Sequence, residues 1–179
     1  MRAPEESPVS TNISQSLLPE FDVEIANTRK TLERVPEGNP DFRPHPKSMT
    51  LARLAGHVAE IPMWALMTLG QDELDMNPVG GSQYAPYVMS SRKDALAKFD
   101  ENVKKTRDML ASTTDETMMK TWTLKNGGQT VLAMPRVAVM RSFVMNHMVH
   151  HRAQLGVYLR MNDVAVPAIY GPSADEGGM

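Results

Sequence analysis

Cysteine is absent from all 179 residues of the chain. Disulfide bonds, thiolate metal ligands and a cysteine nucleophile are therefore excluded. An excess of one charge is also lacking, because 19 lysines and arginines stand against 21 aspartates and glutamates. A nucleic-acid partner requires a clustered basic surface, and no strongly basic stretch occurs, so we do not expect such a partner.

Long apolar runs are missing as well. The longest, from Ile61 to Met67, is much too short to cross a bilayer. The N-terminal stretch has neither the basic region nor the apolar region of a secretory signal. We therefore expect no membrane partner and a cytoplasmic location. The length of the chain suits one domain with a real hydrophobic core.

The period of the apolar residues predicts four substantial helices. Pro19 lies either in the first turn of the first helix or at a kink in a longer one. Ser48 or Thr50 can begin the second helix, and Ser90 or Ser91 can begin the third. The helices are expected at about 13–34, 50–70, 91–110 and 136–161.

Two connections carry turn signals. The polar segment from Asp72 to Tyr87 contains two prolines and a Gly-Gly pair, which predicts a long loop. The segment from Trp122 to Leu132 contains Asn126-Gly127 between β-forming residues, which predicts a short hairpin. The sequence thus predicts an all-α four-helix bundle with a small β-hairpin before the last helix. This single domain covers residues 13–173, with a flexible arm at 1–12 and a frayed tail at 174–179.

Two histidines lie one turn apart in the last predicted helix. His147 and His151 can point at one spot, because residues four apart share a face of an α-helix. They interrupt an apolar stripe, where histidines without strong partners are costly to bury. His57 points inward from the second helix, so three imidazoles could meet inside the bundle. Such a set suits Zn, Ni, Co or Cu and leaves a coordination position open. The His-x-x-x-His step is also compatible with two ordinary core or surface histidines.

Four further residues could support the histidines or position a substrate. Glu60 follows His57 by one turn and has three interpretations: a fourth ligand, an acceptor that holds a histidine N–H, or a solvated edge residue. Gln154, Tyr158 and Trp64 are the other candidates for positioning.

His150 and Arg152 flank His151 but are each turned about 100° from it around the helix. His150 therefore cannot share an ion with His151 without distortion, and we expect it at the side of the bundle. Arg152 is expected to pair with another helix or with a carboxylate of the tail.

Several enzyme classes are excluded by their motifs. The protease pattern His-Glu-x-x-His needs a general base at the position of Met148, which cannot accept a proton. The ferritin-like di-iron pattern needs a Glu-x-x-His step, but Met63 follows Glu60 at that spacing. No Walker, nucleophile-elbow or dinucleotide-binding glycine motif occurs.

At these residues the chain resembles the DinB/YfiT-like superfamily of bacterial metal-binding four-helix bundles. The matching segments are residues 147–160 (HMVHHRAQLGVYLR), 166–173, 48–64 and 122–136. Ala153 departs from the pattern, since the family often has glycine there. The resemblance implies an up-down-down-up bundle in which His57, His147 and His151 hold a divalent ion, usually nickel or zinc. It also implies a homodimer.

Characterised members of that superfamily include transferases and isomerases that use bacillithiol, mycothiol or glutathione. The resemblance therefore implies a transferase that uses a low-molecular-weight thiol as cofactor and acts on a small electrophilic substrate. A coordinated thiol loses its proton to become a nucleophile. The alternatives are a metal-water hydrolase, a non-catalytic metal-binding stress-response module, and a dimeric helical bundle without metal.

Overall fold

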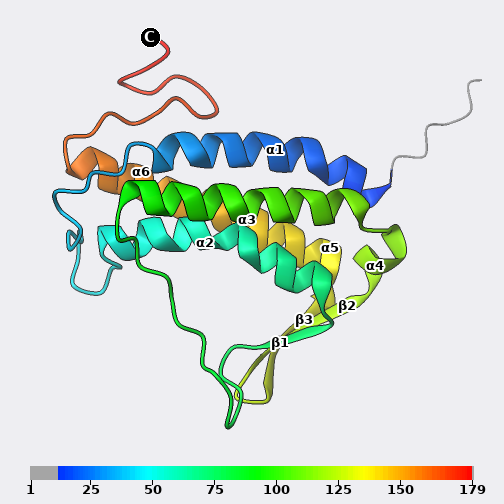
Figure 1. The fold of residues 1–179 in the computed structure, drawn as a ribbon. Helices are drawn as coiled ribbons and strands as arrows, with labels where there is room; N and C mark the ends of the chain where they lie inside the picture. Colours follow the sequence, from blue (N-terminus) through cyan, green and yellow to red (C-terminus); the bar gives the residue numbers. More distant parts are fainter. Residues whose placement is uncertain (1–11, 179) are drawn as a thin grey trace, which may run out of the picture.

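The computed structural model describes residues 12–178 and shows long helices lying side by side, with a small sheet at one end (Figure 1). The long helices are α1 (Ile13–Leu32), α2 (Leu51–Gly70), α3 (Arg92–Ser112) and α6 (His147–Met161). The expected arm at 1–12 lies outside the described residues except for Asn12, which caps α1.

Helices α2 and α3 run in the same direction, whereas α1 and α6 run in the opposite one (Figure 1). This is the up-down-down-up order that the family resemblance implied. It requires a long return between α2 and α3, and residues 71–91 provide it by running from the sheet back to the other end of the bundle (Figure 1). The four-helix bundle prediction is confirmed.

The helix starts follow the local signals in the sequence. Thr50 accepts a hydrogen bond from the backbone N–H of Arg53 at 3.2 Å, and Ser91 accepts one from the N–H of Asp94 at 3.0 Å. Such caps satisfy backbone donors that have no partner inside the helix. Pro19 lies inside α1, so the longer of the two predicted helices is the correct one.

The hairpin is confirmed, but it belongs to a three-stranded sheet. Strands β2 (Thr121–Asn126) and β3 (Gln129–Pro135) are antiparallel, and β1 (Glu73–Asp75) pairs with β2 in parallel. The prediction of an unbroken loop after α2 was therefore wrong at β1, which is three residues long and forms only through its distant partner. A short helix, α4 (Asp115–Met119), was also not predicted.

The turn of the hairpin differs by one residue from the predicted one. Asn126 pairs with Gln129, so the two central residues are Gly127 and Gly128, with φ of +60° and +79°. Glycine adopts these left-handed conformations without steric cost. The carboxylate of Asp75 accepts hydrogen bonds from both glycine N–H groups, which fixes β1 against the turn.

The last helix is not the uniform α-helix that was expected. It begins as α5 (Arg136–Val139), continues as the π-helix η1 (Met140–Asn146), and becomes α6 only at His147. A π-helical turn changes the angular relation between residues before and after it. The direction in which His147 leaves the helix therefore depends on the packing of η1, and no proline or glycine in the sequence marks it.

The core lies between the four long helices and contains side chains from each of them. Its largest fully buried members include Phe21, Leu54, Ile61, Phe99, Leu110 and Met145. None of the helices in the described part of the chain is both long enough and apolar enough to span a membrane.

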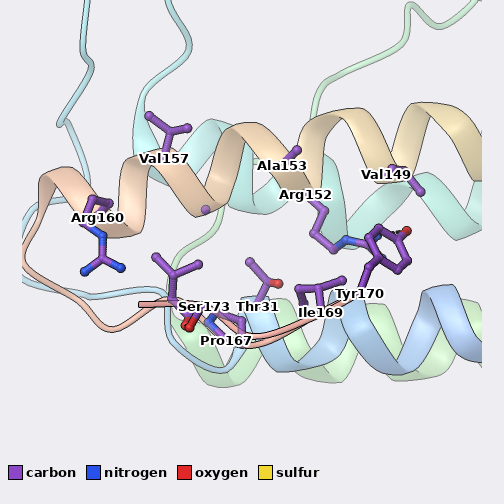
Figure 2. A pocket seen from close by; sticks show the side chains of 12 residues that line it. Thr31, Val149, Arg152, Ala153, Val157, Arg160, Pro167, Ile169, Tyr170 and Ser173 are labelled. Atoms are coloured by element: carbon purple, nitrogen blue, oxygen red, sulfur yellow. Dashed lines mark hydrogen bonds between the residues drawn. The ribbon is translucent and has the colours of Figure 1, made fainter. Parts of the chain in front are cut away.

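A buried ion pair joins α6 to α1. Arg152 is 4% exposed, and its Nη1 lies 2.7 Å from a carboxylate oxygen of Glu24. Tyr170, from the C-terminal segment, donates its hydroxyl to the same carboxylate. This confirms that Arg152 pairs with another helix, and Figure 2 shows its side chain reaching towards Tyr170.

The C-terminal segment packs along α6 and encloses an apolar groove of about 440 Å³ with it (Figure 2). Val149, Ala153 and Val157 form the α6 side of this groove. Asp175 pairs with Arg160, and Glu176 pairs with Arg34. These contacts hold part of the segment 174–179 that was expected to fray.

Candidate metal centre

Packing of α2 against α6 brings three histidines together. His57, His147 and His151 each offer a ring nitrogen, and the three nitrogens lie within 4.8 Å of one another. The Nε2 atoms of His57 and His147 are 3.2 Å apart. His57 and His151 are 7% and 8% exposed, and His147 is half-buried. The expected convergence of these residues is therefore present.

The outer nitrogen of each imidazole already has a hydrogen-bond acceptor. Carboxylate, amide and backbone oxygens cannot donate, so each Nδ1 must carry the proton. Each Nε2 is then left with a lone pair that can bind an ion. The acceptors are Glu60 Oε1 for His57 at 2.9 Å, the Phe143 carbonyl for His147 at 3.2 Å, and Gln154 Oε1 for His151 at 2.7 Å.

The surroundings keep two of these imidazoles neutral. Burial, followed by repulsion from neighbouring histidines, lowers the pKa of His147. Burial also lowers the pKa of His151, to about 4, against the opposing effect of its hydrogen bond to Gln154. Neutral imidazole is the form that binds a metal. The site can therefore offer nitrogen lone pairs at neutral pH without first releasing protons.

Glu60 lies behind His57 and acts as its acceptor. It is 2% exposed, so the interpretation as a solvated edge residue was wrong. Its other hydrogen bonds come from Arg53 Nη1 at 3.2 Å and the Tyr87 N–H at 3.1 Å. Burial acts to raise the pKa of Glu60, but the hydrogen bonds from His57 and the Tyr87 N–H, the nearby Tyr84 phenol and the positive charge of Arg53 outweigh it and lower the pKa. Glu60 is thus an anion that orients His57.

No fourth protein ligand joins the three histidines among residues 12–178. His150 is exposed and lies outside the group, as expected from its angle on the helix. Three imidazoles with an open position fit a borderline divalent ion such as zinc or nickel, rather than magnesium or calcium. The donor set therefore fits the type of ion that the sequence suggested.

Two cavities reach the histidines from different sides. The loop-side cavity has a volume of about 450 Å³ and lies between the loop before α2 and helix α6; its lining includes Lys47, Met49, His151, Gln154 and Tyr158. The sheet-side cavity, about 300 Å³, lies between α2, η1 and the sheet; its lining includes Arg53, His57, Trp64, Tyr84, Phe143 and His147.

The remaining predicted site residues fall into these cavities. Gln154 both holds His151 and lines the loop-side cavity. Tyr158 lines the same cavity but donates its hydroxyl to the Met49 carbonyl at 2.9 Å, which fixes the loop. Trp64 lines the sheet-side cavity and packs edge-on against Tyr84, with ring centroids 5.6 Å apart.

Three residues near the centre were not identified from the sequence. Arg53 precedes His57 by four residues, and the same-face argument that linked His147 to His151 could have found it. Lys47 and Tyr84 come from irregular segments, where no periodic pattern predicts a side chain's direction.

Comparison with known proteins agrees with this architecture. The model of the DinB superfamily matches residues 20–155. A DinB-like protein from Bacillus cereus ATCC 10987 is 23% identical, with a TM-score of 0.67 over 89% of this chain and 99% of that one. A DinB-like protein from Bacillus subtilis, YjoA, is 16% identical, with a TM-score of 0.64 over 86% and 96% of the two chains.

A third structure, YfiT from Bacillus subtilis, is 15% identical, with a TM-score of 0.62 over 92% of this chain and 95% of that one. It is described as a probable metal-dependent hydrolase with an unusual four-helix bundle topology. No match is found among curated proteins. Because the family model covers more than half of its residues, this chain belongs to the DinB superfamily.

Proposed function

We propose that this protein is a metal-dependent enzyme whose ion is held by His57, His147 and His151. The supporting observation is the convergence of three imidazole nitrogens within 4.8 Å, each imidazole with its outer nitrogen hydrogen-bonded to an oxygen acceptor. Unprotonated nitrogens packed this closely repel one another unless a cation lies between them. Glu60, Gln154 and the Phe143 carbonyl keep the three rings in that orientation.

The reaction that we favour is transfer of a low-molecular-weight thiol to a small electrophile. A divalent ion in this centre would supply Lewis acidity, which lowers the pKa of a coordinating thiol. The chain has no cysteine, so the thiol must come from another molecule. Two cavities of about 300 and 450 Å³ reach the histidines, which suits a reaction that brings two molecules together.

Metal content tests the first half of the proposal. We expect purified protein to contain about one equivalent of zinc or nickel by elemental analysis. The His147→Ala protein should lose the ion, whereas the His150→Ala protein should keep it, because His150 is exposed on the next position around α6. Equal metal content in both variants would contradict the assignment of the ligands.

Turnover tests the second half. Metal-loaded protein is mixed with a panel of small thiols and electrophiles, and consumption of the thiol is followed. We expect turnover that needs both the ion and the thiol, and a spectral change when a thiol is added to the cobalt-substituted form. No turnover and no spectral change would contradict thiol transfer.

A metal-dependent hydrolase is the second candidate. The description of YfiT favours it, and an open coordination position also suits water activation. Hydrolysis of esters or amides by the metal-loaded protein, with no thiol present, would identify this reaction instead.

A further inference from the structure

Two residues that line the sheet-side cavity each have a buried polar atom without a hydrogen-bond partner. Among the described residues, Trp64 Nε1 and the Tyr84 hydroxyl are the buried side-chain nitrogen and oxygen atoms that lack one. A buried donor left unpaired loses its hydrogen bonds to water without replacement, so such groups are rare in native proteins. Both residues line the same cavity beside His57 and His147. Their position suggests that a bound molecule completes their hydrogen bonds.

The chemistry of the two groups restricts what that molecule can be. The indole N–H of Trp64 can only donate. Burial, together with the nearby Glu60 carboxylate, raises the pKa of Tyr84, so this phenol keeps its proton and can donate as well. Two unpaired donors on neighbouring rings require an acceptor. A ligand oxygen meets this requirement, whereas an ammonium group does not.

Arg53 gives the cavity its charge preference. Its Nη1 is hydrogen-bonded to Glu60 and to the Tyr87 carbonyl, both at 3.2 Å. Its Nε and Nη2 make no hydrogen bond to any residue of the described chain. The Arg53 side chain is 21% exposed, and it lines the cavity. The remaining donors of an arginine fork match the two oxygens of a carboxylate.

The other walls are apolar. Met76, Leu124 and Phe143 complete the lining, and the total volume of about 300 Å³ suits a small molecule of roughly one substituted ring. Phe143 also lines a shallow hollow on the outer side of the helix, next to His147. The cavity therefore combines apolar walls with one cation and two hydrogen-bond donors, beside His57 and His147.

We propose that the sheet-side cavity binds a small, largely apolar molecule that carries a carboxylate, with the carboxylate facing Arg53, Trp64 and Tyr84. This inference names the substrate class of the proposed enzyme and so rests on the proposed function. The apolar body of the ligand lies against Met76, Leu124 and Phe143. Both donor atoms are buried, so binding in this way requires the half-buried Tyr84 ring to turn and uncover its own hydroxyl and the indole N–H of Trp64.

Calorimetric titration with phenylacetate tests the proposal. We expect phenylacetate to bind and phenethylamine, which has similar size and the opposite charge, not to bind. Trp64→Phe and Tyr84→Phe each remove one donor and should weaken phenylacetate binding about fivefold to tenfold. Arg53→Met should weaken it more than tenfold. Lys47→Gln removes a cation from the loop-side cavity and should leave this affinity unchanged.

Phenylacetate titrations of metal-loaded and chelator-treated protein distinguish this carboxylate site from the proposed metal-dependent function. Binding to both forms, weakened by the Trp64 and Tyr84 variants, supports the cavity as a carboxylate site. Binding to the metal-loaded form alone would mean that phenylacetate only coordinates the ion, which would overturn the cavity proposal. The cavity proposal would also be overturned if phenethylamine binds as well as phenylacetate, or if phenylacetate does not bind at all. A protein that binds phenylacetate but no metal would refute the proposed function and leave the cavity assignment intact.

Discussion

Gly56 allows the segment before α3 to lie against α2, and its replacement should disturb both stability and the metal centre. A Cβ atom at position 56 would lie 2.5 Å from the Tyr87 carbonyl oxygen and 2.9 Å from the Met89 nitrogen. These are backbone atoms, which cannot swing aside as a flexible side chain can. The Met89 N–H also donates to the Ala52 carbonyl at 3.0 Å, so the segment is fixed to the helix at this point.

Two opposing effects decide how much the free energy of unfolding changes in the Gly56→Ala protein. Alanine stabilises a helix interior by about 1 kcal/mol relative to glycine. Forcing an extra carbon into a packed site costs about 1–3 kcal/mol, and an overlap with backbone belongs at the upper end. We therefore expect a net loss of about 1–2 kcal/mol in the free energy of unfolding.

Gly156→Ala is the matched control. Gly156 also lies inside a long helix, but its added Cβ would meet only a Val166 methyl group at 3.8 Å, an ordinary contact. This variant should gain up to about 1 kcal/mol. Urea unfolding of the two chelator-treated variants measures the difference directly. Equal stabilisation of both would refute the close packing of residues 87–89 against α2.

The same substitution should weaken metal binding. Displacement of the Tyr87 backbone removes the N–H that holds Glu60 Oε2, and Glu60 orients His57. Loss of such an outer hydrogen bond lowers metal affinity about tenfold to a hundredfold. Competition with a chromogenic chelator measures the affinity, and unchanged binding in Gly56→Ala would show that Glu60 does not need this contact.

Three further predictions concern α6. Arg152→Met leaves Glu24 buried without its cation and should lower the free energy of unfolding by about 3–5 kcal/mol, measured with urea. Arg160→Met removes an exposed ion pair and should lower it by less than about 1 kcal/mol. Equal losses in the two variants would contradict the importance of the buried pair. Chelator-treated protein should lose stability as the pH falls from about 6.5 towards 4, because unfolded His151 binds a proton near its ordinary pKa and the folded residue only at a pKa of about 4. Urea midpoints across this range should vary less in the His151→Gln protein. Gln154→Ala removes the acceptor of His151 and should lower metal affinity about tenfold in chelator competition, with little change in unfolding because Gln154 is exposed.

The parts of the fold that the sequence predicted are those set by local interactions. Thr50 and Ser91 begin their helices through hydrogen bonds that span three residues. His147 and His151 share a face because of helix geometry alone. Only the approach of His57 required a tertiary assumption, and its place on the apolar stripe of α2 justified that assumption.

The parts that were missed depend on distant partners. Strand β1 has three residues and exists because β2, almost fifty residues later, offers it a parallel edge. The π-helical segment η1 contains no proline or glycine that would mark it in the sequence. Tyr84 and Lys47 reach the two cavities from irregular segments, whose side-chain directions follow no period. Local rules therefore identified the histidines but not the residues that surround a ligand.

The balance of charge around the histidines connects the proposed ion with the proposed ligand. Burial keeps the imidazoles of His147 and His151 neutral, and the negative charge of Glu60 is matched by Arg53 at 3.2 Å. The protein therefore does little to neutralise a divalent ion in this centre. The electric field of such an ion would extend into both cavities, because a low-dielectric interior screens it weakly. With the proposed ion bound, molecules that bring their own negative charge, such as a thiolate or a carboxylate, would be attracted, and an ammonium compound of the same shape would be repelled.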